Sequence, residues 1–363
     1  MKRTSELVLC LFVAIAGVVA AETPGVAEGA EPFLSGEFSW NLPPPLLAAE
    51  QGRKDFCYSV KDPSVVFYNG RWHVFDTTRS AIRSHRVEYV SFRRWEEANA
   101  GKRHVLNCRG KEYIAAPQVF YFRPQKKWYL IYQVVEKGRK PALQPAYSTT
   151  ENIEDPNSWS PASLLFDKDP EGVSQWIDFW IICDEKKAHF FFTSMDGRFC
   201  RSSTSLNEFP RGFGKCEVVL REDNSDWQLF EASHTYKLKG MDKYLTIVEA
   251  IRRAQPSGRR FYVAYVAERL DGEWKPLAAS LEKPFASADP GKGQRESNVI
   301  QPKPRWTDNI SHGELIRAGY DETMTVDPAN LQFVIQGVLA KDAAGKKYGE
   351  IPWRLGILSP VPK

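Results

Sequence analysis

Short apolar strands separated by turn residues run through most of the chain. Asn69-Gly70 stands between two apolar runs and is the strongest hairpin signal in the sequence. Similar turns are expected at 123–127, 184–187 and 239–242. No long segment spaces its apolar residues with the 3.6-residue period of an amphipathic helix. The pattern therefore predicts an all-β fold.

A polar residue heads a short apolar strand at five points, and each of these strands leads into a hairpin with a second, aromatic-rich strand. The five heads, at intervals of 53 to 81 residues, are Asp62, Gln118, Asp178, Glu231 and His312. Strand-built units that recur at such lengths are typical of a β-propeller. Because the innermost strands of a propeller start around one axis, we expect the five side chains to converge in one pocket.

The two ends of the chain differ from this strand-rich part. Residues 1–21 begin with two basic residues and continue into an apolar run that is too short to span a bilayer. This predicts a cleaved export signal, a secreted or periplasmic protein and no membrane association after cleavage. Residues 22–55 are rich in Gly, Pro, Ala and Glu and are interpreted as a linker or arm. Residues 56–363 are interpreted as one domain, in which the last strand, 352–358, completes the first blade.

Charge and cysteine content limit the classes of partner. The 49 Lys and Arg against 45 Asp and Glu give a net charge of +4, which falls by one without the signal. Basic pairs such as Arg259-Arg260 stand among acidic residues and are interpreted as solvated surface, which argues against nucleic-acid binding. Five of the six cysteines follow the signal. They show no metal-ligand spacing, and both disulfides and buried thiols are compatible with them.

Three of the five heads are carboxylates, which is the set of groups that glycoside hydrolysis needs. One carboxyl must be protonated to donate to the leaving oxygen, and another must be ionised to activate water or attack the sugar. A third carboxylate nearby raises the pKa of the acid, because like charges disfavour joint ionisation. Asp62, Asp178 and Glu231 would supply this set from three different blades.

Segments along nearly all of the strand-rich part resemble glycoside hydrolase family 62. The resembling segments are 58–66, 115–122, 176–180, 230–233, 244–250, 310–314, 323–328 and 351–356. The resemblance implies a five-bladed β-propeller. It also implies an inverting α-L-arabinofuranosidase that removes arabinose side chains from arabinoxylan, and we expect a monomer.

The same resemblance implies a role for each catalytic carboxylate. Asp62 falls on the general base of the family and Glu231 on the general acid. Asp178 falls on the aspartate that tunes the pKa of the acid and orients the sugar.

Further residues are implied to bind the sugar or a metal ion. Lys61, Gln118, Trp180 and Tyr348 would contact arabinofuranose, although Trp180 could instead pack between blades. His312 falls where family members hold a calcium ion at the propeller axis, mostly through water. No organic cofactor is expected.

Two other functions remain open. A related propeller enzyme could use the same three carboxylates on arabinan or on a xylosidic bond, against which the segments 176–180 and 311–314 argue. A non-catalytic carbohydrate-binding propeller would not need the carboxylates, and all three are present.

Overall fold

The computed structural model describes residues 33–50, 55–253, 259–289 and 297–362. The predicted export signal, residues 1–21, lies outside these ranges, as does part of the predicted arm. Within them, the structure contains no helix with the length and apolar character that crossing a membrane requires.

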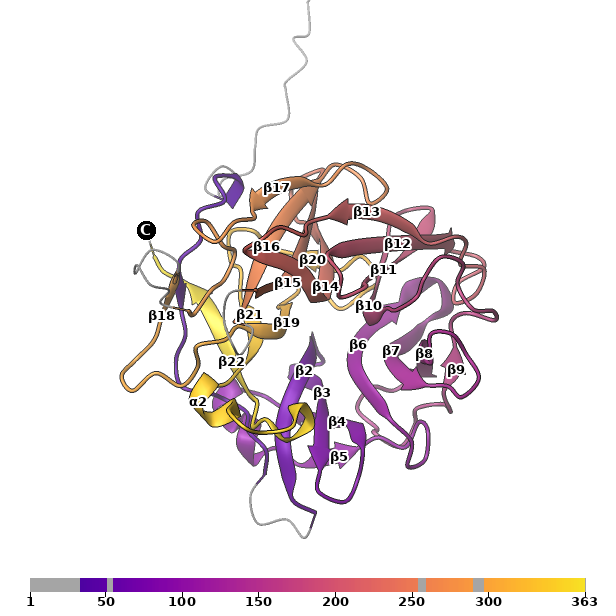
Figure 1. Ribbon diagram of the computed structural model, residues 1–363. Coiled ribbons are helices and arrows are strands. Elements are labelled where there is room, and N and C mark those ends of the chain that lie inside the picture. Colours follow the sequence, from indigo (N-terminus) through magenta and orange to yellow (C-terminus); the bar gives the residue numbers. More distant parts are fainter. Residues whose placement is uncertain (1–32, 51–54, 254–258, 290–296, 363) are drawn as a thin grey trace, which may run out of the picture.

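Five β-sheets radiate from a common centre in the described residues, so the predicted five-bladed β-propeller is confirmed (Figure 1). Blade 1 contains β2 (Cys57–Tyr68), β3 (Arg71–Ser80), β4 (His85–Phe92) and β5 (Arg103–Val105). Blade 2 contains β6 (Ile114–Phe122), β7 (Lys127–Val135), β8 (Leu143–Thr150) and β9 (Ser163–Leu164). Blade 3 contains β10 (Ile177–Cys183), β11 (Lys187–Thr193), β12 (Arg198–Ser205) and β13 (Glu217–Arg221).

The last two blades each include a strand from elsewhere in the chain. Blade 4 contains β14 (Trp227–Leu238), β15 (Tyr244–Arg252), β16 (Arg260–Ala267), β17 (Lys275–Ala278) and the added β20 (Thr325–Val326). Blade 5 contains β19 (Ser311–Leu315), β21 (Phe333–Gly337), β22 (Arg354–Pro360), β1 (Trp40–Asn41) and β18 (Val299–Ile300). The short helices are η1 (Trp95–Ala100), η2 (Arg123–Gln125), α2 (Ala340–Ala343) and η3 (Tyr348–Glu350).

Turn chemistry and apolar runs account for these strands. Asn69 and Gly70 both have positive φ, 49° and 72°, as the central residues of a type I′ hairpin turn require, so the hairpin predicted there is confirmed. The second strands of the blades, such as β7, β11 and β15, follow the apolar runs of the sequence.

Apolar side chains fill the space between neighbouring blades on both faces of a sheet. In β11, Phe190, Phe191 and Phe192 are fully buried. Phe190 and Phe192 have their ring centroids 6.0 and 5.5 Å from that of Trp176. Phe191 instead lies 6.2 Å from Trp274. A strand buried on both faces has no polar side, which explains why the strands read as continuous apolar runs.

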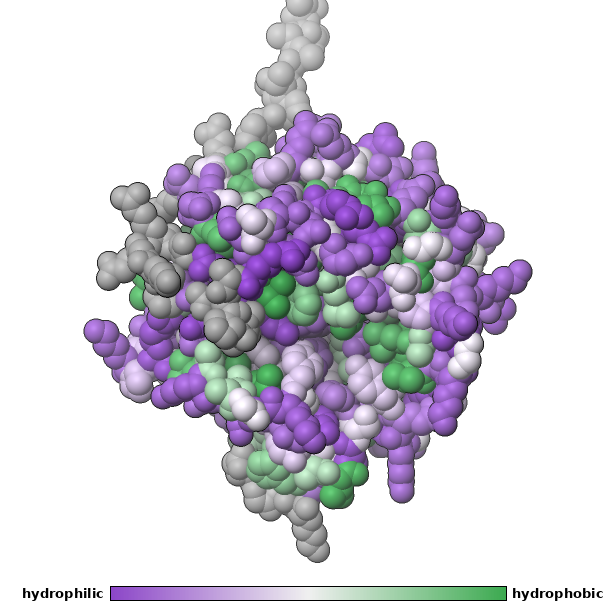
Figure 2. All heavy atoms as spheres, viewed as in Figure 1, coloured by the Kyte–Doolittle hydropathy of each residue, from purple (hydrophilic) through white to green (hydrophobic). Residues whose placement is uncertain are grey.

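Polar residues cover most of the outer surface that Figure 2 shows, and apolar residues form small, separate patches on it. The five described cysteines are free thiols, and four of them are buried. Burial between blades therefore explains their presence without a disulfide.

The ring is closed in blade 5, and the prediction that the last strand completes the first blade is wrong. β22 pairs with β21 on one side and with β1, from the predicted arm, on the other. Of the two alternatives for residues 22–55, this part agrees with an arm lying on the domain and not with a linker, because Trp40 is buried and donates its indole N–H to the carbonyl oxygen of Phe285 at 2.7 Å. A strand of two residues is too short to show an alternation of polar and apolar residues, so the sequence gives no signal for β1.

Every innermost strand contains a β-bulge near the axis, where it holds one extra residue relative to its partner. The pairing register shifts directly after Lys61, Ala115, Ile177, Glu231 and Ser311. In four blades the first bulged residue has a positive φ, which is 51° at Asp62, 51° at Ala116, 54° at Asp178 and 48° at Ala232. In blade 5 the extra residue is His312.

The bulges show that the five polar heads are not equivalent positions. Asp62, Asp178 and His312 occupy the bulge, but Glu231 stands one residue before its bulge and Gln118 two residues after Ala116. The five residues therefore do not share one position at the heads of the innermost strands. A bulge shifts the side chains that follow it by one position. The intervals between the repeats vary by much more than one residue, so they cannot reveal this shift.

The closure of blade 5 predicts a large effect of Trp40→Ala. Because removing a buried tryptophan leaves a cavity, we expect the free energy of unfolding in urea to fall by about 3–5 kcal/mol. Ile300→Ala in β18 of the same sheet is the matched control, since Ile300 is 56% exposed, and it should change stability by less than about 0.5 kcal/mol. A loss for Trp40→Ala no larger than that of the control would contradict the closure.

Candidate active site

Three of the polar heads lie together at the bulges of the innermost strands of blades 1, 3 and 5. His312 Nδ1 is 3.5 Å from Asp62 Oδ1 and 3.4 Å from Asp178 Oδ2. Each of these three side chains is only 5% exposed. The structure thus brings Asp62, Asp178 and His312 together at the axis, as the repeat pattern predicts.

Asp62 is held as an anion by two cations. Lys61 Nζ lies 3.0 Å from Asp62 Oδ2, on the side away from the His312 contact at Oδ1. Burial disfavours the carboxylate, but the charges of Lys61 and His312 outweigh it and hold the pKa of Asp62 below its ordinary value. A buried carboxylate that stays ionised at neutral pH is suited to accept a proton.

His312 is a cation at neutral pH. Burial favours the neutral ring, but the carboxylates of Asp178 and Asp62 raise the pKa of His312 to about 9. Its neighbour His234, whose ring centroid is 5.2 Å away, has a pKa well below the ordinary value because it is buried beside this charge. The imidazolium of His312 therefore bridges two carboxylates from different blades.

Glu231 lies in a different environment, formed by two residues that the sequence reading missed. Arg260 Nη1, at the start of β16, donates to Glu231 Oε1 and to Glu249 Oε1 of β15, the latter at 2.6 Å. The Arg260 side chain is 13% exposed and that of Glu249 is fully buried, so the interpretation of Arg259-Arg260 as solvated surface is wrong for Arg260. A single acid within an apolar strand is the signal that could have revealed Glu249.

The pKa of Glu231 is raised to about 7. Burial is the largest cause, the charge of Arg260 opposes it, and the negative charges of Glu249 and then Asp178 add to the increase. Asp178 thus contributes less to this pKa than burial and Glu249 do. Its closer contact is with the backbone, since Asp178 Oδ2 accepts the N–H of Ala232 at 2.9 Å.

Lys61 and Tyr348 border the carboxylates. The ring centroid of Tyr348 is 5.1 Å from Lys61 Nζ and 5.6 Å from Arg260 Cζ. Tyr348 is 45% exposed, so its ring lies between the interior charges and the surface. The positions of Lys61 and Tyr348 agree with sugar contacts, which stay a prediction.

The backbone N–H of each bulge is capped by a side chain of the preceding blade. Asp62 donates to Gln336, Ala116 to Thr77, Asp178 to Gln133, Ala232 to Asp178 and His312 to Glu249, at 2.7, 2.8, 3.4, 2.9 and 2.7 Å. Because buried N–H groups are costly when unpaired, these five contacts hold the bulges in place. They also fix how neighbouring blades meet around the site.

A second ring of contacts lies two residues further along each innermost strand, and it contains Gln118 and Trp180. Gln118 Nε2 donates to Ile181 O at 2.7 Å while its Oε1 accepts the N–H of Ile181 at 2.8 Å. Trp180 is 1% exposed, donates to Thr235 O at 2.8 Å and stacks on His234. The placement of Gln118 and Trp180 does not support the predicted sugar contacts, because their polar groups are engaged between blades.

The side chains at the axis do not fit a directly bound calcium ion. An imidazolium has no free nitrogen lone pair, and His312 carries this charge between Asp62 and Asp178. The described part of the chain brings together no group of three or more His, Cys, Asp or Glu that could hold a metal. Calcium takes six to eight oxygen ligands, so calcium held through water at His312 stays a prediction.

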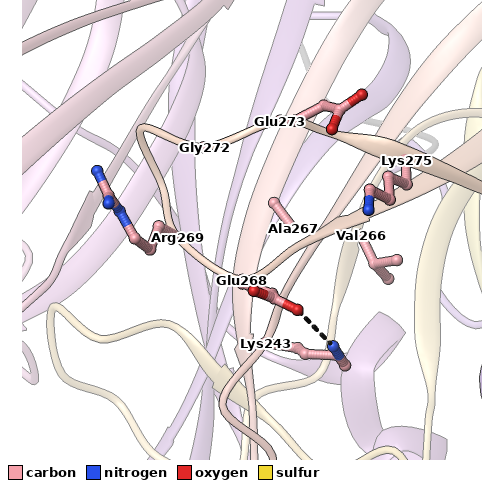
Figure 3. A pocket seen from close by; sticks show the side chains of 8 residues that line it. All are labelled: Lys243, Val266, Ala267, Glu268, Arg269, Gly272, Glu273 and Lys275. Atoms are coloured by element: carbon pink, nitrogen blue, oxygen red, sulfur yellow. Dashed lines mark ion pairs between the residues drawn. The ribbon is translucent and has the colours of Figure 1, made fainter.

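A surface pocket of about 360 Å³ on blade 4 is separate from this site (Figure 3). Lys243 and Glu268 form a 3.6 Å ion pair there, and the Glu268 side chain is 84% exposed. The lining residues are Lys243, Val266, Ala267, Glu268, Arg269, Gly272, Glu273 and Lys275. None of the candidate site residues borders this pocket.

Comparison with known proteins identifies one family over most of the chain. The family model described as glycosyl hydrolase family 62 matches residues 48–359. α-L-Arabinofuranosidase C of Cellvibrio japonicus is 40% identical over 302 residues, which are 83% of this chain and 44% of that protein. The chain therefore spans less than half the length of this relative.

Solved structures resemble the whole propeller. The catalytic domain of a Coprinopsis cinerea GH62 α-L-arabinofuranosidase is 35% identical, with a TM-score of 0.80, over 90% of this chain and 98% of that chain. A GH62 hydrolase in complex with xylotriose is 33% identical, with a TM-score of 0.78, over 89% and 98% of the two chains.

The contacts of His312 predict an unusually high midpoint for its titration. Because Asp62 and Asp178 stabilise the imidazolium, ¹⁵N NMR of the ring should show a pKa of about 9. His312→Gln assigns the signal by removing it. A midpoint near the ordinary value of about 6.5 would contradict the charged bridge.

Proposed function

The chain belongs to glycosyl hydrolase family 62, and from this premise we propose that it is an inverting α-L-arabinofuranosidase acting on arabinoxylan. Two relatives that cover most of this chain are α-L-arabinofuranosidases. The structural relative solved with xylotriose supports a xylan backbone as the polymer that carries the arabinose. A polysaccharide substrate also agrees with export of the enzyme, for which residues 1–21 are the proposed signal.

One feature of the site carries the proposal, and it is the difference in electrostatic surroundings between Asp62, which lies beside Lys61 and His312, and Glu231, which is buried near two further carboxyl groups. The pKa of Asp62 is held below its ordinary value, while the pKa of Glu231 is raised to about 7. At mildly acidic pH the first group is therefore a base and the second an acid. Glycoside hydrolysis in one step requires this pair on opposite sides of the scissile bond.

In the proposed reaction Asp62 accepts a proton from a water molecule as that water attacks the anomeric carbon of arabinofuranose. Glu231 donates its proton to the oxygen that leaves with xylose. Asp178 and His312 orient the reacting groups from blades 3 and 5, and Lys61 and Tyr348 contact the sugar hydroxyls. Inversion requires room for the water, so the two carboxyl groups should be about 6.5–9.5 Å apart in a substrate complex.

The experiment that tests this function is proton NMR of sugars released from wheat arabinoxylan. The first product should be β-L-arabinofuranose, because inversion converts the α bond of the substrate. Glu231→Gln should lower kcat/KM by about 10²–10⁴-fold, since it can no longer donate a proton.

Arabinan serves as the parallel substrate, and circular dichroism checks that the variant is folded. Release of arabinose from arabinan alone would favour the related arabinan-acting enzyme. A first product with retained configuration, or a fully active Glu231→Gln, would contradict the proposed mechanism.

A further inference from the structure

Glu249 occupies a position at which two other blades carry a neutral glutamine. It lies in the second strand of blade 4, opposite the residue before the bulge, as Gln133 does in blade 2 and Gln336 in blade 5. All three accept a bulge N–H from the following blade, at 2.7, 3.4 and 2.7 Å. A neutral amide therefore suffices for this contact, and the negative charge of Glu249 needs another explanation.

Glu249 forms an ion pair with the arginine that also binds Glu231. Glu249 Oε2 accepts from His312 N and from Ser311 Oγ, at 2.7 and 3.0 Å, and its Oε1 accepts from Arg260 Nη1 at 2.6 Å. The same Arg260 nitrogen donates to Glu231 Oε1. Arg260 is thus shared between two carboxyl groups of blade 4.

Glu231 faces charged or titratable groups from four elements. Arg260 of β16 is the cation that faces it, the carboxyl groups of Glu249 in β15 and Asp178 in β10 act on it with negative charge, and Tyr348 of η3 lies nearby. If Glu249 were neutral, the full charge of Arg260 would act on Glu231 alone and favour its ionised form.

We propose that Glu249 is a positioning residue that keeps the general acid protonated by sharing Arg260 with it. Glu249 holds the guanidinium in contact with Glu231 and balances its charge, so that Glu231 can carry the proton that the leaving oxygen needs. This inference rests on the proposed function. The effects of burial, Arg260 and Glu249 on the pKa of Glu231, which is about 7, have the corresponding directions.

The test is Glu249→Gln, whose amide oxygen keeps an acceptor for His312 N, while its NH2 group removes the charge and the acceptor that faces Arg260. Because an opposite charge without balance lowers a carboxyl pKa by about 1–3 units, the alkaline limb of kcat/KM on arabinoxylan should move down by at least one pH unit. At pH 7, the midpoint of the wild type, this lowers the protonated fraction of Glu231 from about one half to about one tenth, so kcat/KM falls about fivefold. Glu249→Asp, which keeps the charge, should return the alkaline limb of kcat/KM most of the way to its wild-type pH.

A substrate that needs no acid separates this role from a structural one. In an aryl α-L-arabinofuranoside, a dinitrophenolate leaving group departs without protonation. Glu249→Gln should therefore cleave such a substrate at nearly the wild-type rate. Glu268→Gln is the matched control, since it is the same change at an exposed position of blade 4, and its pH profile should equal that of the wild type.

Superimposable pH profiles of Glu249→Gln and the wild type would overturn the inference, whereas a wild type that releases no arabinose would overturn the proposed function instead. If Glu249→Gln does not fold, Arg260→Gln tests the same charge balance. Removing the cation should move the alkaline limb to higher pH, and an unmoved limb in folded Arg260→Gln would also overturn the inference.

Discussion

In each of the five blades, the innermost strand holds one extra residue near the axis, and the side chain and N–H of this residue are turned out of the regular sheet. A positive φ at a non-glycine residue costs about 1–3 kcal/mol and persists only where neighbours enforce it. Here the preceding blade supplies a hydrogen-bond acceptor for every bulge. The bulges therefore link the packing of the blades to the placement of Asp62, Asp178 and His312. A change at one blade interface would move a reacting group of the next blade.

The same arrangement determines the charge balance of the site. It brings together three cationic and four carboxyl side chains, which are Lys61, Arg260 and His312 with Asp62, Asp178, Glu231 and Glu249. With one carboxyl more than there are cations, burial favours a proton on one of them. Glu231 has the raised pKa and is the group that would hold it. The charged neighbours of each carboxyl group, and not the choice of Asp or Glu, therefore determine which group is the acid and which is the base.

Sequence reasoning reached the fold class and the three bulge residues, because the repeat of strands and the polar heads are local patterns. It left the place of Trp180 open between the sugar pocket and the blade interface and did not predict the hydrogen bonds of Gln118 between blades. A bulge shifts which residues face the axis and leaves no mark in repeat spacing, and sugar contacts of the two residues stay a prediction. It also missed Arg260 and Glu249. Their contact with Glu231 depends on how β14, β15 and β16 pair, and a basic pair at a strand start looks like solvated surface until that pairing is known.

The most direct test of the account is a ¹³C NMR titration of the side-chain carboxyl groups of Asp62 and Glu231 in the same protein. We expect Glu231 to titrate near pH 7 and Asp62 below its ordinary range of about 4. Assignment follows from Asp62→Asn and Glu231→Gln. Two ordinary carboxyl midpoints, or a raised midpoint at Asp62 and not at Glu231, would contradict the assignment of base and acid.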